Sequence, residues 1–245
     1  MKRLFSLMLI LLPILVFAAQ KSAVPGHQDF RKELAELEAI KSKGVQSPDL
    51  YYNIGVCQAR LNQESEAILS FLRCLNLNSA HKPARANLEY LISLSNDSQL
   101  YPQRQFISSQ MLDLYDWFSI NRSSLAVLIL LLLSVACMHW LLHHHQDREK
   151  GLPILLLIVC GVLLLSFNSL LITKVYRMNH NRKAVIVQGS VIMRAEQQPE
   201  SRSIRTLHRS LIVQVAQQEG DWARIILPNG NSGWVKSSDL ERVSK

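Results

Sequence analysis

Residues 220–243, GDWARIILPNGNSGWVKSSDLERV, decide how the C-terminal part of this chain folds. Two short runs in this stretch, WARII and SGWVK, are rich in β-formers, and the dipeptide Asn229-Gly230 lies between them. Alternating or β-branched runs of this length indicate strands, and Asn-Gly between two such runs is the strongest local signal for a hairpin turn. The stretch therefore predicts a β-hairpin with Trp222 on its first strand and Trp234 on its second.

Further β-type runs precede this hairpin at intervals of about ten residues, which is typical of a small all-β barrel. The runs AVIVQGSVIMRA and SLIVQVAQQEG are β-branched and broken by turn residues, so we expect five or six strands over residues 184–245. The pattern of an initial valine run, VIMR, then WARI and GWV resembles a bacterial-type SH3 domain. The resemblance implies an SH3-like barrel in which Gly233 and Trp234 begin a strand.

Trp222 and Trp234 have two interpretations. Both side chains can fill the core and rim of a barrel that is too small to close without large residues, or they can form a ligand-binding ridge. The SH3-like pattern implies that Trp222 lies nearer the ligand-facing end and that Trp234 packs nearer the sheet. Residues 184–245 contain no Phe and no Tyr, so the aromatic groove that binds proline-rich helices is not expected. Peptidoglycan and protein are the two ligand classes that the sequence leaves as alternatives.

The remaining chain holds three apolar runs. Residues 1–19, with Lys2 and Arg3 before a short apolar run, predict a signal peptide, and an uncleaved anchor is the alternative. Residues 123–142 and 152–173 are uncharged and long enough to span a bilayer as helices. The loop 143–151 between them is so short that the two spans form an antiparallel transmembrane hairpin.

The hairpin places the regions before and after it on one side of the membrane. The signal peptide favours the periplasmic side of a bacterial inner membrane for both regions. The count of basic residues opposes this, because the loop has two and the linker 174–183 has four. We expect the signal peptide to dominate, because it acts first.

Residues 20–100 predict a helical region. Ser47 followed by Pro48 is a favoured helix start. The segments YYNIG and RANLE are related by a period of 34 residues, and 34 residues is the length of a tetratricopeptide repeat. The packing positions of such a repeat correspond to Tyr51, Gly55, Ala67 and Phe71.

A tetratricopeptide unit offers a protein-binding groove on its inner face, and a plain helical spacer is the alternative. The groove residues would be Asp49, Tyr52, Val56, Ala59 and Arg60. Residues 101–122 follow, with Ile107, Met111, Leu114 and Phe118 at helical spacing. They predict a juxtamembrane amphipathic helix, or one that packs against the repeats.

Composition excludes several classes of function. The net charge of +8 arises mostly beside the apolar runs, so it indicates membrane topology and no nucleic-acid-binding surface. No Walker loop, GxSxG or HExxH occurs, so neither an enzyme nor a cofactor is expected. No metal site is expected either, because the cysteines form no CxxC and His143–His145 are adjacent. Cys57 and Cys74 are expected to be buried free thiols, a disulfide between them being the alternative.

The chain is thus expected to be a multidomain membrane protein: an all-α tetratricopeptide-like region, a two-helix transmembrane hairpin and a C-terminal SH3-like barrel. This order of parts resembles the BatE-type proteins of the aerotolerance operon, and YYNIG, EAILSFLRCLNLN, ANLEYL and GWVKSSDLERV carry the resemblance. It implies von Willebrand A-domain membrane proteins and a MoxR-type ATPase as partners, and a non-enzymatic scaffold in envelope stress tolerance. The alternative is a sensor or anchor whose SH3-like domain binds peptidoglycan.

Overall fold

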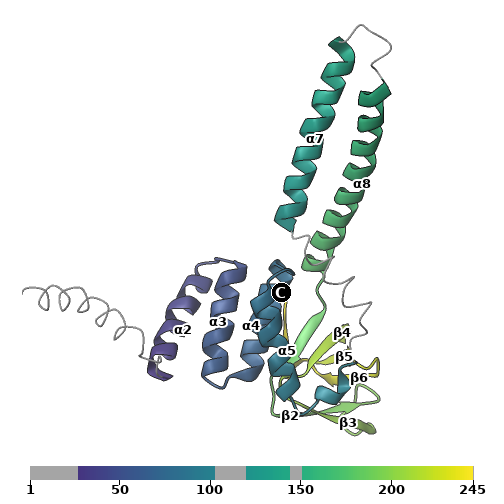
Figure 1. The fold of residues 1–245 in the computed structure, drawn as a ribbon. Coiled ribbons are helices and arrows are strands. Elements are labelled where there is room, and N and C mark those ends of the chain that lie inside the picture. Colours follow the sequence, from purple (N-terminus) through teal and green to yellow (C-terminus); the bar gives the residue numbers. More distant parts are fainter. Residues whose placement is uncertain (1–26, 103–119, 144–150, 245) are drawn as a thin grey trace, which may run out of the picture.

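The computed structural model describes residues 27–102, 120–143 and 151–244. The N-terminal part is helical, with α2 (His27–Ser42), α3 (Pro48–Arg60), α4 (Glu64–Leu77), α5 (Lys82–Leu94) and the short 3-10 helix η1 (Ser98–Leu100). Figure 1 shows α2 to α5 side by side, each next to the helix that follows it in the chain. The signal peptide expected at residues 1–19 and most of the juxtamembrane helix expected at 101–122 lie outside the described residues.

Local signals set the limits of these helices. Ser47 is the N-cap of α3, because its hydroxyl accepts a hydrogen bond from the Leu50 backbone N–H at 3.1 Å, and Pro48 follows it as expected. Asp29 lies in the first turn of α2, where its negative charge favours the helix N-terminus. Gly44, with a φ of +85°, follows the end of α2 in the left-handed conformation that favours glycine.

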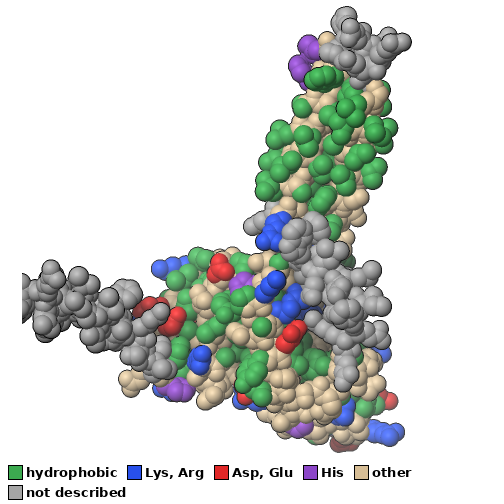
Figure 2. Space-filling view, viewed as in Figure 1, with side chains coloured by type: hydrophobic (Ala, Val, Ile, Leu, Met, Phe, Trp, Pro, Cys, Tyr) green, Lys and Arg blue, Asp and Glu red, His purple; other side chains and the backbone are tan. Residues whose placement is uncertain are grey.

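Two long apolar helices, α7 (Ile120–His143) and α8 (Gly151–Asn179), pack against each other and project together from the rest of the molecule (Figure 1). Both are long and apolar enough to cross a membrane. Figure 2 shows apolar side chains over the surface of this helix pair. Leu132 and Leu165 are among the exposed ones. Polar side chains within them, such as Ser166 and Asn168, donate to the backbone carbonyl four residues earlier, so these groups do not need water.

The helix α8 is longer than its apolar run. A basic linker was expected at residues 174–183, whereas α8 continues to Asn179 and only three residues separate it from the first strand. The side-chain amide of Asn76 on α4 donates to the Met178 backbone carbonyl at 3.0 Å. The side-chain amide of Asn181 donates to Oδ1 of Asn76 at 2.8 Å. These hydrogen bonds hold the end of α8 against α4.

The C-terminal part is an antiparallel sheet with strand order β3-β2-β6-β5-β4-β1-β7. It has seven strands, more than the five or six expected, because a short last strand pairs with β1. Gly230, with a φ of +88°, lies in the turn between β5 and β6, so the Asn229-Gly230 turn is confirmed. The strands are β1 (Lys183–Ile186), β2 (Ser190–Arg194), β3 (Ser203–His208), β4 (Ile212–Glu219), β5 (Trp222–Ile226), β6 (Ser232–Lys236) and β7 (Leu240–Arg242).

The sheet wraps around a core of its own. Alternate residues of β1 to β6 point into one buried cluster, which includes Ile186, Met193 and Ile225, each at most 1% exposed. Leu100, from η1 of the helical region, belongs to the same cluster. In turn, Val185 and Val243 of the sheet region belong to the core of the helices. The helical region and the sheet therefore share buried surface and form one folded body.

Candidate binding surface

The outer face of β5 and β6 carries both tryptophans. Ala223, Ile225, Gly233 and Val235 point into the core, so their neighbours in each strand point outward. Trp222 is opposite Lys236, and Arg224 is opposite Trp234. These four residues and Arg194 of β2, which is opposite Trp234, are called the tryptophan face below.

The register places the two indole rings on one diagonal of the β5–β6 pair. Diagonal neighbours on one face are about 7–8 Å apart, which is within reach of aromatic side chains. Both tryptophans are half-buried, whereas Arg224 and Lys236 are exposed. Arg194 is partly fixed, because its guanidinium donates to the Ser201 carbonyl at 2.9 Å.

This geometry combines flat apolar rings with three cationic groups. An indole ring that keeps one face toward water can stack on the apolar face of a sugar or on another planar group. The neighbouring Arg and Lys side chains can donate charge-assisted hydrogen bonds to a carboxylate or phosphate. The face also carries one acid, Glu219, which is opposite Trp222 and accepts hydrogen bonds from Gln197 and Gln217. The tryptophan face is therefore suited to a ligand with both planar and anionic parts.

The structure gives Trp222 and Trp234 the same burial, whereas the SH3-like pattern implied that Trp234 packs nearer the sheet. Trp234 is half-buried like Trp222 and lies on the same outer face. The residue before Trp234 is Gly233, which faces the core. An added Cβ on Gly233 would lie 2.5 Å from Met193 Cγ. The side chain of Met193 thus lies directly against Gly233 and fills the core there.

The residues expected to pack the repeat come together between α3 and α4. Gly55 faces the ring of Phe71, and an added Cβ there would lie 2.7 Å from Phe71 Cε1. Ala67 and Phe71 are fully buried, and Tyr51 packs against the same cluster. These contacts let α3 and α4 approach closely.

The expected groove residues all lie on α3. Asp49 and Arg60 are exposed, and Val56 and Ala59 are half-buried. Tyr52 is partly committed to packing, because its ring lies 4.8 Å from that of His81 and 6.0 Å from that of Phe71. Tyr52, Val56 and Ala59 pack against the core of the helices, so only Asp49 and Arg60 of this set are exposed.

The sequence interpretation missed the contacts that join the helices to the sheet. The buried hydroxyls of Ser65 and Ser210 are 3.0 Å apart. The carboxylate of Asp97, 2% exposed, accepts a hydrogen bond from the His208 backbone N–H at 2.8 Å. The Tyr101 hydroxyl accepts from the Ile212 N–H at 3.0 Å, and burial raises the pKa of Tyr101 to about 12. No local pattern marks such pairs, because their members are more than 100 residues apart in the chain.

The tryptophan-face cations could have been found from the sequence. Strand alternation alone places Arg224 two residues after Trp222, and Lys236 two residues after Trp234, on the same side of their strands. Only the pairing of β2 with β6, which adds Arg194, needed the tertiary structure.

Cysteine and histidine chemistry is limited in the described part of the chain. Cys57 and Cys74 are buried free thiols, as expected, and burial raises the pKa of Cys57 to about 11 and that of Cys74 to about 12. Among the described residues, no group of three His, Cys, Asp or Glu side chains could hold a metal ion. His143 ends α7, and the other two histidines of the triplet lie outside the described residues.

Comparison with known proteins identifies the sheet region. A family model described as bacterial SH3 domain matches residues 187–241, which run from the end of β1 to β7. No curated protein and no solved structure matches the chain. The SH3-like character of the C-terminal domain is thus confirmed, whereas the tetratricopeptide repeat and the resemblance to BatE-type proteins stay predictions.

Proposed function

We propose that this protein is a membrane-anchored binding protein whose SH3-like domain binds peptidoglycan through the tryptophan face. The observation that carries the proposal is the pairing of Trp222 and Trp234 with Arg194, Arg224 and Lys236 on one outer surface. Peptidoglycan offers sugar rings for the indoles and stem-peptide carboxylates for the cations. The match to the bacterial SH3 domain family supports this choice, because such domains often bind the cell wall.

The test is sedimentation of the purified full chain in detergent with insoluble peptidoglycan. We expect Trp222→Ala and Trp234→Ala each to weaken binding, since one aromatic contact contributes about 0.5–1.5 kcal/mol, or roughly two- to tenfold. Arg224→Gln should weaken binding in a salt-dependent way. Tyr90→Ala is the matched control, because Tyr90 is an aromatic residue on α5 that is 64% exposed. Equal sedimentation of all four variants and the native chain would refute the proposal.

Membrane anchorage rests on the two apolar helices. α7 and α8 expose apolar side chains along their length, and such a surface is stable only in a bilayer or against other apolar surface. The helical region precedes the pair and the SH3-like domain follows it, yet the two regions share buried surface. A hairpin that crosses the membrane twice returns the chain to the side it left, so it is compatible with this shared core.

We place both regions in the periplasm, on the strength of the N-terminal signal pattern. A reporter that works only outside the cytoplasm should be active after Lys245 and inactive after Gln146. Activity at Gln146 alone would put both regions in the cytoplasm, in agreement with the count of basic residues.

A second function, binding of a partner protein by the helical region, is favoured by the exposed charged side chains of α3. Asp49 and Arg60 are exposed there, beside the half-buried Val56. The resemblance to BatE-type proteins suggests von Willebrand A-domain membrane proteins and a MoxR-type ATPase system as partners in envelope stress tolerance. The native chain and Asp49→Lys/Arg60→Glu should be compared in pull-downs from solubilised membranes, with Arg205→Glu on β3 as the control. Recovery of the same proteins by all three chains would exclude this surface.

A further inference from the structure

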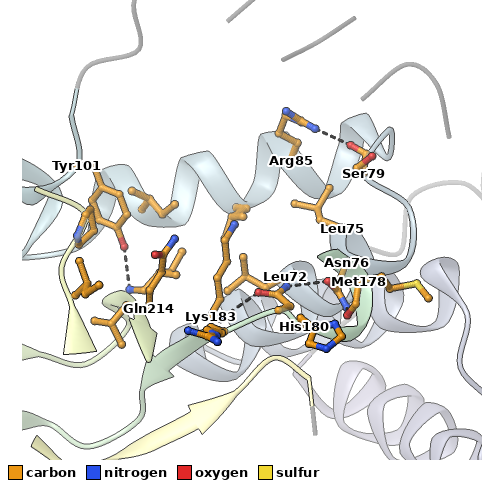
Figure 3. A pocket seen from close by; sticks show the side chains of 18 of the residues that line it. Leu72, Leu75, Asn76, Ser79, Arg85, Tyr101, Met178, His180, Lys183 and Gln214 are labelled. Atoms are coloured by element: carbon orange, nitrogen blue, oxygen red, sulfur yellow. Dashed lines mark hydrogen bonds between the residues drawn. The ribbon is translucent and has the colours of Figure 1, made fainter. Parts of the chain in front are cut away.

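A cleft of about 1040 Å³ lies where the helical region, the SH3-like domain and the end of α8 meet (Figure 3). Its walls come from α4 and α5, from the last residues of α8 with the linker to β1, and from β4 and the turn after β5. Ligand pockets in proteins usually measure about 300–1,000 Å³, so this cleft is large enough for a large ligand.

One side of the cleft is apolar. Figure 3 shows Leu72 and Leu75 of α4 directed toward it. Leu88 and Ile92 of α5 also line it, as does Leu227, which follows β5. Such a surface favours a ligand with a hydrocarbon part.

The other side is cationic. Among the described residues that line the cleft, four are Arg or Lys and one, Glu89, is acidic. Arg85 lies on α5, where its guanidinium donates to the Ser79 carbonyl at 2.6 Å. Lys174 lies on α8, and Arg182 and Lys183 follow that helix. This excess of positive charge is complementary to an anionic group.

The position of the cleft relates it to the membrane. The apolar run of α8 ends at Tyr176, and Met178, His180 and Arg182 already line the cleft. Ile120, the first residue of α7, lines it too. A bilayer around α7 and α8 would therefore have its headgroup region at the mouth of the cleft.

We propose that this cleft binds an anionic phospholipid taken from the bilayer, with the phosphate at Arg85, Arg182 and Lys183 and an acyl chain along Leu75 and Ile92. Neither the SH3-like domain nor the helical region encloses this site alone. Bound lipid would tie the folded body to the membrane surface at a fixed orientation. This inference rests on the proposed membrane anchorage but is independent of peptidoglycan binding.

The first experiment uses the full chain in nanodiscs, released into detergent and analysed by native mass spectrometry for retained lipid. We expect the chain to retain phosphatidylglycerol in preference to phosphatidylcholine. Arg182→Glu should lower this retention about fivefold or more, the usual effect of one basic residue near an anionic lipid surface. Arg205→Glu, an equal charge change on the exposed strand β3, is the matched control and should leave retention unchanged. Equal retention by both variants refutes the proposal.

A second experiment identifies the occupant directly. A photoreactive amino acid at position 75 in the otherwise native chain should form an adduct with phospholipid. The competing occupant is the chain's own segment 103–119, which joins Tyr101 to Ile120, both of which line the cleft. A cross-link from position 75 to a peptide of residues 103–119 refutes lipid binding. The same photoreactive residue at position 94, on the exposed Leu94 of α5, is the control for nonspecific labelling.

The two proposals fail separately. Loss of lipid selectivity with unchanged peptidoglycan sedimentation refutes only the lipid site. Recovery of the chain from cells without detergent, in the soluble fraction, refutes the membrane anchorage and the lipid site together. Loss of peptidoglycan binding alone leaves the lipid site intact.

Discussion

The contact between Gly55 and Phe71 gives the sharpest prediction for the helical region. Alanine normally stabilises a helix interior by up to about 1 kcal/mol relative to glycine. At Gly55, however, the new Cβ would lie 2.7 Å from Phe71 Cε1 and 2.8 Å from Cδ1. Carbon atoms in good contact are about 3.5–4.0 Å apart. Phe71 is fully buried, so its ring cannot turn out of the way.

The two effects oppose each other in Gly55→Ala. Overpacking of a buried site costs about 1–3 kcal/mol, which outweighs the helix-propensity gain of up to about 1 kcal/mol. We therefore expect Gly55→Ala to lower the free energy of unfolding by about 1 kcal/mol. In a Phe71→Leu background the ring is absent, and the same change should be neutral or stabilising. The coupling energy between the two positions, which is the difference between these two effects, should be about 1–2 kcal/mol.

The assay is denaturant unfolding of the four chains of this double-mutant cycle, as full chains in detergent, followed by far-UV circular dichroism. The full chain is needed because the helical region shares its core with the SH3-like domain. Gly161→Ala on α8 is the control, since an added Cβ there has nothing within 4 Å. A coupling energy below about 0.5 kcal/mol, the usual error of additivity, would show that α3 and α4 do not meet at this glycine.

Three further predictions follow from the described contacts. Trp234→Ala should lower the free energy of unfolding by less than the roughly 3–5 kcal/mol typical of a buried aromatic residue, because the Trp234 ring is half-buried. A loss of that size or larger in a thermal melt would show that the ring belongs to the core. Tyr101→Phe should cost about 1–3 kcal/mol by leaving the Ile212 N–H without its acceptor, whereas Tyr90→Phe, on an exposed ring, should cost nothing measurable. Because burial raises the pKa of Cys74 from 9.0 to about 12, its stabilising contribution is complete below pH 9 and is lost as pH rises toward 12. The free energy of unfolding, measured between about pH 8 and 11, should therefore fall less steeply for Cys74→Ala than for the native chain, and parallel curves would contradict the assignment.

The sequence by itself determined the features that depend on local chemistry. The Ser47 cap and the following proline start α3, and Asn229-Gly230 turns the chain between β5 and β6. Two uncharged apolar runs are long helices, and the β-type runs after them form the SH3-like domain. Each of these follows from residues that are neighbours in the chain, where periodicity and turn chemistry decide the backbone conformation.

Only the tertiary structure decided which faces of these elements meet. Local patterns show that a face is buried but not what covers it, since packing is decided by shape and by hydrogen bonds between distant residues. Thus Met193, and not Trp234, fills the core beside Gly233, and Trp234 is left on the outer face with Arg194. In the same way, the contacts of Ser65 with Ser210 and of Tyr101 with Ile212 join the helices to the sheet. Tyr101 and Ile212 also line the cleft beside α8.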